Sequence, residues 1–347
     1  MEKTPHIIHK KWTTATLPKR ILVIRLQAMG DVVITLPYIQ SLRNQLPADT
    51  IIDFLTRDET ADIAQNIDLF NKVFVIKGKR NFKKHVFYTI LLIPKLFLRI
   101  YDVVIDLQNN KISHLATAFL FPKAWTLFDK FSPIFAGTRN QNTINALGFV
   151  ESNIDHGICF KQKSLSQDIL EKHSISEPFI IINPAGFFET RNWQTENYVN
   201  LCKIIQEKLP HIIFVVLGIG LIEQKAIILQ KQLGKENCIS VVGNTSPSEA
   251  LAIVKKARMV ISEDSGLLHF AFAVGTPTLA ILGSTPSYWL NSGLPNAFFL
   301  DSSDLECGNC FQAVCKRGDI HCLTRYTPQF VAEKVFDLLN KTEKIEA

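Results

Sequence analysis

Residues 257–282, ARMVISEDSGLLHFAFAVGTPTLAIL, combine side chains that could bind a charged ligand with the elements that would position them. A run of strand-forming residues ends at two acids, Glu263 and Asp264, and Ser265-Gly266 leads directly into a short apolar helix. In open α/β sheets, the turn after a strand lies at the carboxyl edge, where ligands bind. The start of a helix also offers unpaired N–H groups and a positive dipole end to an anion.

The two acids do not suit a ligand that is only a phosphate, because a carboxylate repels an anion. They suit a ligand that carries both phosphate and hydroxyl groups. The backbone N–H groups of Ser265, Gly266 and Leu267 would then bind a diphosphate, and Asp264 would accept hydrogen bonds from sugar hydroxyls. His269 lies on the same predicted helix, where we expect a packed, hydrogen-bonded histidine.

A second acid follows the first predicted strand, in IRLQAMGDVVITLP. Gly30 predicts a tight turn there, and Asp31 stands just ahead of a helix that is expected to begin near Val32. Asp is favoured as a helix cap, but its carboxylate could also take a proton from an attacking hydroxyl. Both roles can hold at once. Asp106, at the end of another predicted strand, is a possible supporting acid.

Two loops of the second half add further groups. In INPAGFFETRNW, Gly186 belongs to the turn, and Arg191 could hold a phosphate by a two-pronged contact; a solvated surface arginine is the alternative. Trp193 is expected in the core. In LGIGLIE, two glycines allow close approach of a ligand, and Glu223 could hold ribose hydroxyls or be an ordinary exposed helix acid.

The segment CGNCFQAVCKRGDIHC spaces its cysteines as C-x2-C-x4-C-x6-C, at positions Cys307, Cys310, Cys315 and Cys322. Four thiolates could hold zinc, but the spacing is shorter than that of paired C-x2-C knuckles. We expect a structural loop with buried thiols and no metal, and metal binding stays an open alternative. No D-x-D occurs in the chain; many sugar-nucleotide enzymes of another fold hold a divalent ion with such a pair.

Strands alternate with helical segments in both halves of the chain, which predicts parallel sheets. The strands of the first half are expected at 20–26, 50–56, 72–76 and 101–107, and those of the second at 179–186, 212–218, 238–243, 259–262 and 278–282. Each half therefore predicts a doubly wound, Rossmann-like α/β domain, and the two are expected to face each other across a cleft. The division is a tail at 1–19, a first domain at 20–165, a second domain at 175–327 and a C-terminal helix at 328–347.

Length and composition suit two ordinary domains: the chain has 347 residues, of which 47% are hydrophobic. The net charge of +6 is too small to indicate nucleic-acid binding. Residues 1–20 lack the apolar region of a signal peptide, and the most apolar run, residues 86–100, is too short to span a membrane. The seven cysteines cannot all pair and suit a reducing compartment, so a cytoplasmic protein is expected.

Residues 71–100 contain eight cationic side chains and no acid, and apolar side chains are interleaved among them. This pattern suits the surface of an anionic membrane. A solvated charge run beside a core helix is the alternative. The cations are Lys72, Lys77, Lys79, Arg80, Lys83, Lys84, Lys95 and Arg99.

Several stretches, in this order, resemble glycosyltransferase family 9, the ADP-heptose:lipopolysaccharide heptosyltransferases. The resemblance covers roughly residues 20–340 and rests on ILVIRLQAMGDVVITLP, DLQNN, NPAGFFETRNW and VVGNTSPSEALAIVKKARMVISEDSGLLHFAFAVGTPTLAILG. The cysteine-rich segment also resembles one branch of the family. The chain departs from the family pattern at Phe187 and Phe188, where small hydroxyl residues are usual, and at Gln194, where proline is common.

The resemblance implies a GT-B fold and an inverting, metal-independent transfer of heptose from ADP-heptose, without a cofactor. The acceptor would be the lipid A-core oligosaccharide, reached at the cytoplasmic face of the anionic inner membrane. Asp31 matches the catalytic base, Arg191 the basic residue on the donor phosphates, and Asp264 the acid that holds the heptose. The full expected donor-binding set is Gly30, Gly186, Arg191, Glu223, Asp264, Ser265, Gly266 and Leu267, with His269 and Asp106 in support.

Two other functions remain open from the sequence. A sugar-nucleotide 2-epimerase shares the two-domain architecture but needs no lipid acceptor. A non-catalytic sugar-nucleotide-binding module is the other alternative, and the presence of both Asp31 and Arg191 weighs against it.

Overall fold

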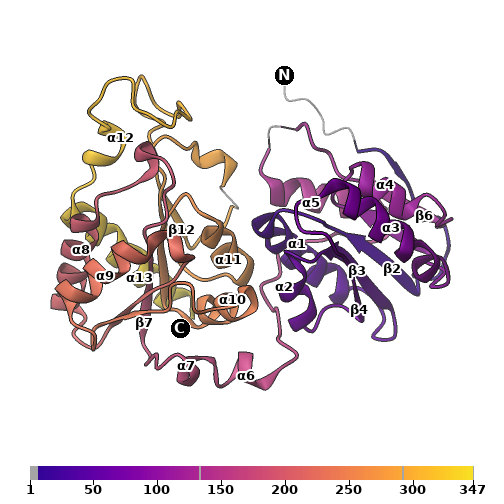
Figure 1. The fold of residues 1–347 in the computed structure, drawn as a ribbon, viewed down its shortest axis with the longest axis horizontal. Helices are drawn as coiled ribbons and strands as arrows, with labels where there is room; N and C mark the ends of the chain where they lie inside the picture. Colours follow the sequence, from indigo (N-terminus) through magenta and orange to yellow (C-terminus); the bar gives the residue numbers. More distant parts are fainter. Residues whose placement is uncertain (1–6, 133, 291–292, 347) are drawn as a thin grey trace. The chain divides into compact units, whose positions relative to one another are not determined.

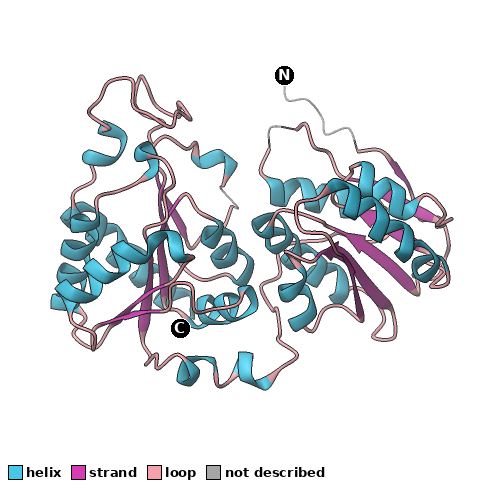
Figure 2. Ribbon diagram, viewed as in Figure 1, coloured by secondary structure: helices cyan, strands magenta, loops and turns pink. Residues whose placement is uncertain are grey.

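The computed structural model describes residues 7–132, 134–290 and 293–346. The chain divides into two compact units, residues 1–162 and 163–347 (Figure 1). Each unit has a sheet with helices on both faces, as Figure 2 shows.

The sheet of the first unit is built from short runs rich in Val, Ile and Leu, and its central strands are buried, as parallel sheets require. The strand order is β1-β6-β5-β2-β3-β4, and only β1 runs antiparallel to its neighbour. The order reverses between β2 and β5, which makes that point the expected ligand-binding edge. The strands are β1 (His9–Lys10), β2 (Arg20–Ile24), β3 (Ile51–Arg57), β4 (Lys72–Ile76), β5 (Val103–Asp106) and β6 (Ala124–Leu127).

Five helices cover this sheet: α1 (Met29–Asn44), α2 (Ala61–Asn66), α3 (Phe82–Phe97), α4 (Lys111–Thr117) and α5 (Ala136–Asn145). Helices α3 and α4 pack against each other, as do α1 and α5. Strand side chains such as Leu22 and Ile24 form one apolar core with Leu96 of α3 and Ile112 of α4.

The second unit has a fully parallel sheet in the order β12-β11-β10-β7-β8-β9, with its reversal between β7 and β10. The strands are β7 (Phe179–Asn183), β8 (Ile213–Val216), β9 (Cys238–Ser240), β10 (Met259–Glu263), β11 (Thr278–Ile281) and β12 (Ala297–Leu300). The helices are α6 (Lys163–Ser166), α7 (Ile169–Lys172), α8 (Thr195–Lys208), α9 (Glu223–Leu233), α10 (Pro247–Lys256), α11 (Gly266–Val274), α12 (His321–Thr324) and α13 (Pro328–Glu346), with 3-10 turns η1 (Glu189–Arg191), η2 (Gly220–Ile222) and η3 (Ser287–Trp289).

The predicted strands occur in both units and alternate with helices, as expected. The short outer strands β1, β6 and β12 and the helices α3, α4, α5 and α12 were not predicted from the sequence. Strands of two to four residues are too short to show a periodic pattern in the sequence, so whether they form depends on pairing with a neighbouring strand. β1 shows this, because it exists by pairing with β6 and places part of the expected N-terminal tail in the sheet.

Candidate active site

The turn after β2 positions Asp31. Strand β2 ends at Ile24, Ala28 is extended, and α1 begins at Met29, three residues earlier than predicted. Ala28 is the N-cap residue, so the prediction that Asp31 precedes the helix as its cap is wrong. Asp31 lies instead in the first turn of α1, where its Oδ2 accepts the N–H of Ala28 at 2.9 Å and stabilises the helix start. The predicted turn at Gly30 is wrong: because the cap contact starts the helix at Met29, Gly30 is already helical.

Arg25 holds the Asp31 carboxylate from the other side. Its Nη2 atom lies 3.0 Å from Asp31 Oδ1. The guanidinium also donates to the carbonyl of Leu107 and lies over the Phe128 ring, 4.9 Å from the centroid. Burial lowers the pKa of Arg25, and Asp31 offsets part of this effect. Asp31 itself keeps 39% of its side chain exposed, so its carboxylate is both oriented and accessible to a substrate.

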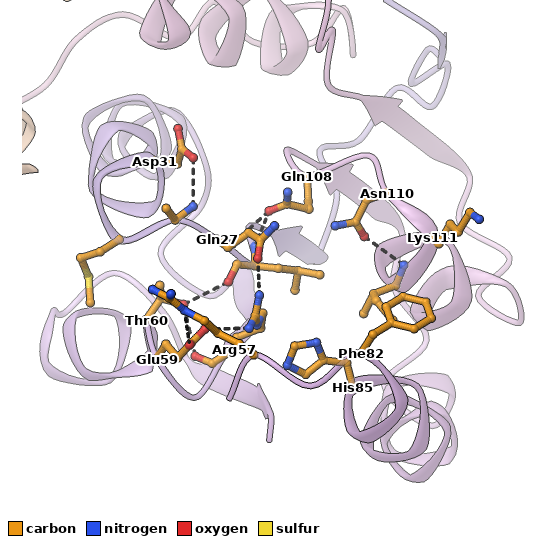
Figure 3. Close-up of a pocket in the computed structure, with 15 residues that line it drawn as sticks. Gln27, Asp31, Arg57, Glu59, Thr60, Phe82, His85, Gln108, Asn110 and Lys111 are labelled. Atoms are coloured by element: carbon orange, nitrogen blue, oxygen red, sulfur yellow. Dashed lines mark hydrogen bonds and ion pairs between the residues drawn. The ribbon is translucent and has the colours of Figure 1, made fainter. Parts of the chain in front are cut away.

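Asp31 lines a pocket of about 840 Å³ in the first unit. Figure 3 shows that its walls come from α1, the end of β3, α3 and the segment that leads into α4. Arg57, Arg80 and Lys111 supply cationic groups, and Glu59 pairs with Arg57 at 2.7 Å. The pocket can therefore receive a polar, anionic molecule next to the carboxylate of Asp31.

Asp106 organises the wall of this pocket rather than facing it. The side chain is buried and accepts hydrogen bonds from the N–H groups of Gln108 and Asn109 and from the hydroxyl of Ser113. Burial raises the pKa of Asp106, and these donors offset part of the effect. The ordered turn places Gln108 Oε1 on the N–H groups at positions 26 and 27. These contacts support a structural role for Asp106.

In the second unit, six of the predicted donor residues lie where β7 and β10 end, at the reversal of strand order: Gly186, Arg191, Asp264, Ser265, Gly266 and Leu267. Gly30, which was also predicted to bind the donor, lies on α1 of the first unit. Arg191 Nη1 lies 3.0 Å from Asp264 Oδ2. The hydroxyl of Thr285 donates to the same Asp264 oxygen at 2.7 Å. Arg191 is 12% exposed, and among the described residues its buried Nε has no hydrogen-bond partner. The buried Nε is out of reach of a ligand, but Asp264 engages only Nη1, so the terminal nitrogens of the guanidinium retain donors for an anion.

The start of α11 lies directly after Asp264. Ser265 is the N-cap, and its hydroxyl accepts the N–H of Leu267 at 3.2 Å and donates to Asn183 Oδ1 at 2.6 Å. The hydroxyl is therefore engaged within the protein, and a contact of this turn with phosphate would come from backbone N–H groups. Gly266 is exposed as the first helical residue, one position earlier than predicted.

Glu263 belongs to the site, although no role was predicted for it from the sequence. It is the last residue of β10 and is fully buried. Its two carboxylate oxygens accept the N–H groups of Gly186 and Trp193, each at 2.5 Å, and Lys225 Nζ lies 3.8 Å away. Burial raises the pKa of Glu263 to about 7, although Lys225 and the two donors act against it. An acid on an apolar strand is the signal that could have revealed this role.

Glu263 fixes the loop that carries Arg191. The loop folds back so tightly that a Cβ on Gly186 would lie 1.9 Å from the carbonyl oxygen of Arg191. Glycine is therefore required at this position for packing. Trp193 closes the loop and is buried, as expected for a core residue.

Glu223 lies farther along the same sheet edge, and His269 lies farther along α11. Glu223 is exposed at the first position of α9, the helix that follows β8, and β8 neighbours β7. His269 is half-buried on α11, and its ring lies at the edge of the Phe272 ring, with centroids 6.5 Å apart.

The cysteine segment differs from the expectation of buried thiols. Cys307 and Cys310 are exposed, Cys315 and Cys322 are half-buried, and all four line a pocket of about 300 Å³. Within the described ranges, no group of three or more His, Cys, Asp or Glu side chains is arranged to hold a metal ion.

Comparison with known proteins defines the class of this chain. Residues 141–321 match glycosyltransferase family 9 (heptosyltransferase), and the chain belongs to this family. It is 24% identical over 298 residues to lipopolysaccharide heptosyltransferase 1 of Campylobacter coli, covering 78% of this chain and 85% of the relative.

Two solved structures share the fold. A glycosyltransferase family 9 protein of Veillonella parvula aligns with a TM-score of 0.74 and 18% identity, over 93% of this chain and 98% of that one. The ADP-heptose LPS heptosyltransferase II of E. coli aligns with a TM-score of 0.70 and 18% identity, over 93% and 99%. The fold is therefore GT-B, with two Rossmann-like domains, and the chain is a glycosyltransferase of the heptosyltransferase type.

Proposed function

We propose that this glycosyltransferase transfers heptose from ADP-heptose to the inner core of lipopolysaccharide, by an inverting and metal-independent reaction. Family membership favours transfer over epimerisation. The names of its relatives, a lipopolysaccharide heptosyltransferase and an ADP-heptose LPS heptosyltransferase, supply the donor and the acceptor class.

The observation that carries the donor assignment is the Arg191–Asp264 pair at the strand reversal of the second unit. A guanidinium with spare donors suits a diphosphate, and a neighbouring carboxylate suits the hydroxyls of a sugar. The N–H groups at the start of α11 add an anion-binding helix terminus beside them. Glu223 is proposed to hold the ribose, because α9 begins at the same sheet edge.

In the proposed reaction, Asp31 takes the proton from the attacking acceptor hydroxyl. The acceptor oxygen then forms a bond to the anomeric carbon of the heptose, while the bond from that carbon to the phosphate oxygen of ADP breaks. The leaving ADP keeps the electron pair, and Arg191 with the α11 N–H groups stabilises its charge. Attack from the face opposite ADP inverts the anomeric configuration. The step is a nucleophilic substitution that changes no oxidation state, so it needs no redox cofactor.

The surface of α3 supports a peripheral membrane location. In the part of the chain that the structure describes, no helix is long and apolar enough to cross a membrane. Helix α3 and the residues after it nevertheless expose large apolar side chains, and the segment after α4, the helix packed on α3, exposes two more. They are Phe82, Phe87, Ile90, Leu91, Phe97, Leu98, Ile100, Phe119 and Phe121.

The same segment carries cations and no acids: Lys83, Lys84 and Lys95 lie on α3, and Arg80 lies just before it. Exposed apolar side chains and exposed cations on one helix suit an anionic lipid surface. We propose that this surface binds the cytoplasmic face of the inner membrane, where a lipid-linked acceptor would be presented.

One assay with ADP-heptose separates the proposed function from its alternatives. We expect heptose to appear on an added lipid A-core acceptor, with release of one ADP for each heptose transferred. An epimerised nucleotide sugar formed without acceptor would instead identify an epimerase, and binding of ADP-heptose without any turnover would identify a binding module. The anomeric configuration of the new linkage, read by NMR, tests inversion.

A further inference from the structure

Arg191 is held between two aromatic rings. Its Cζ atom lies 4.4 Å from the centroid of Phe311 and 5.0 Å from that of Phe188. Cation–π contacts operate at these distances. Asp264 then fixes the guanidinium within this arrangement through Nη1.

Phe311 belongs to the cysteine-rich loop, residues 307–322, and that loop is bonded to the turn that carries Arg191. The hydroxyl of Thr190 donates to the carbonyl of Gln312 at 2.5 Å. The N–H of Cys315 donates to the Glu189 carboxylate at 2.9 Å. Two of the three residues of η1 are thus tied to the loop, and movement of the loop would move Arg191.

The conformation of Phe311 shows that its position is enforced. Its φ angle is +57°, in the left-handed region that bulky residues avoid. Its N–H donates to the carbonyl of Ser284 at 3.1 Å, and its ring contacts that of Trp289 at 5.4 Å between centroids. Although it is 45% exposed, the ring is therefore held against the guanidinium by several contacts.

We propose that the cysteine-rich loop is part of the donor site, and that Phe311, together with Phe188, is a positioning residue for Arg191. This inference rests on the proposed role of Arg191 in binding the donor phosphates. A free arginine side chain loses rotamer entropy when it binds an anion. The two rings restrict the rotamers of the Arg191 side chain before the ligand binds, so the guanidinium is preorganised for the diphosphate.

The test is a double-mutant cycle on ADP affinity, measured by calorimetry on the full chain. Phe311→Leu keeps an apolar side chain and removes the ring, and we expect ADP binding to weaken roughly two- to thirtyfold. Phe311→Tyr keeps the ring and should restore the affinity. In an Arg191→Ala background, Phe311→Leu should have no further effect, because its target is gone. Phe298→Leu, an exposed aromatic residue of β12, is the matched control.

Several outcomes would overturn the inference. An unchanged affinity in Phe311→Leu would exclude a positioning role. Equal losses with and without Arg191, or no rescue by tyrosine, would show that Phe311 acts on the ligand directly or on the fold generally; melting temperatures separate these two. Normal ADP affinity in Arg191→Ala alone would instead reject the proposed donor role of Arg191, on which the inference rests.

Discussion

The Asp31 carboxylate accepts the N–H of Ala28 and pairs with Arg25, so one substitution tests a cap and a base together. Asp31→Asn keeps a cap acceptor but cannot take a proton. We expect turnover to fall about 10²–10⁴-fold, ADP affinity to stay unchanged, and stability to fall by on the order of 1 kcal/mol through the lost ion pair. Steady-state kinetics, calorimetry and melting temperature measure the three quantities.

Asp68→Asn, which changes an exposed acid of the same unit, is the control for the Asp31 variant. Near-normal turnover in Asp31→Asn would end the assignment of Asp31 as the base. The buried and fully engaged Asp106 would not be a ready substitute, because its oxygens already accept three hydrogen bonds.

Arg191 provides the second prediction at single-residue level. A charge-assisted contact to a phosphate contributes roughly 1.5–3 kcal/mol, so Arg191→Ala should weaken ADP binding by about ten- to over a hundredfold. The variant also leaves the negative charge of Asp264 unpaired beside the phosphates. The ADP affinity of Arg191→Lys should lie between those of the unaltered protein and Arg191→Ala, because lysine keeps the charge but lacks the planar guanidinium. Lys231→Ala, an exposed cation of α9, is the control, and equal affinities in all four proteins would contradict the assignment.

Glu263 connects three elements, and its effect should appear in stability as a function of pH. The carboxylate at the end of β10 holds both ends of the Arg191 loop and faces Lys225 of α9. Its pKa in the folded protein is about 7, above its ordinary value of 4.5. The folded state therefore binds the proton more tightly than the unfolded state, and stability is lost as pH rises from about 4.5 to about 7.

Denaturant unfolding at several pH values measures this loss, which we expect to be about 3 kcal/mol for a shift of this size. Glu263→Gln cannot titrate, so its stability should vary less across the same range, whatever the cost of the substitution itself. The same slope in both proteins would show that another group causes the pH dependence.

Helix α3 supplies the prediction for the membrane surface. Each lysine near an anionic lipid surface contributes about 1 kcal/mol, so reversing the charge at Lys83 and Lys84 should weaken vesicle binding by at least about tenfold. Binding of the unaltered protein should rise with the fraction of anionic lipid and fall with salt. Sedimentation with vesicles measures both. The same two reversals at Lys231 and Lys235 in the other unit are the control, and binding indifferent to lipid charge and to salt would contradict the proposal.

The whole enzyme should work without a divalent ion. The chain has no D-x-D pair, and we propose that Arg191 stabilises the leaving phosphates in place of such an ion. We therefore expect heptose transfer to keep its rate in EDTA. Loss of activity in EDTA that magnesium or manganese restores would reject this part of the mechanism. A fall in melting temperature after long chelation would point instead to the cysteine-rich loop.

The strand–helix alternation of both units follows from the sequence, because buried parallel strands are apolar along their whole length. The residues after those strands could also be identified: Asp31, Arg191 and Asp264 all follow a strand that the pattern predicts. The GT-B architecture and the family were implied instead by the resemblance of these motifs, in their order, to glycosyltransferase family 9. Local composition was enough to identify the polar residues that follow the strands, because turns at the carboxyl edge carry polar residues between apolar runs.

Only the tertiary structure decided which partners these side chains have. The pairing of Arg191 with Asp264 joins residues 73 positions apart, and the parallel registration of β7 with β10 brings them together. The ring of Phe311 reaches Arg191 from still farther along the chain, and Glu263 is distinguished from its neighbour Asp264 by burial alone. No local pattern contains these contacts, because they arise from distant segments packed at one sheet edge.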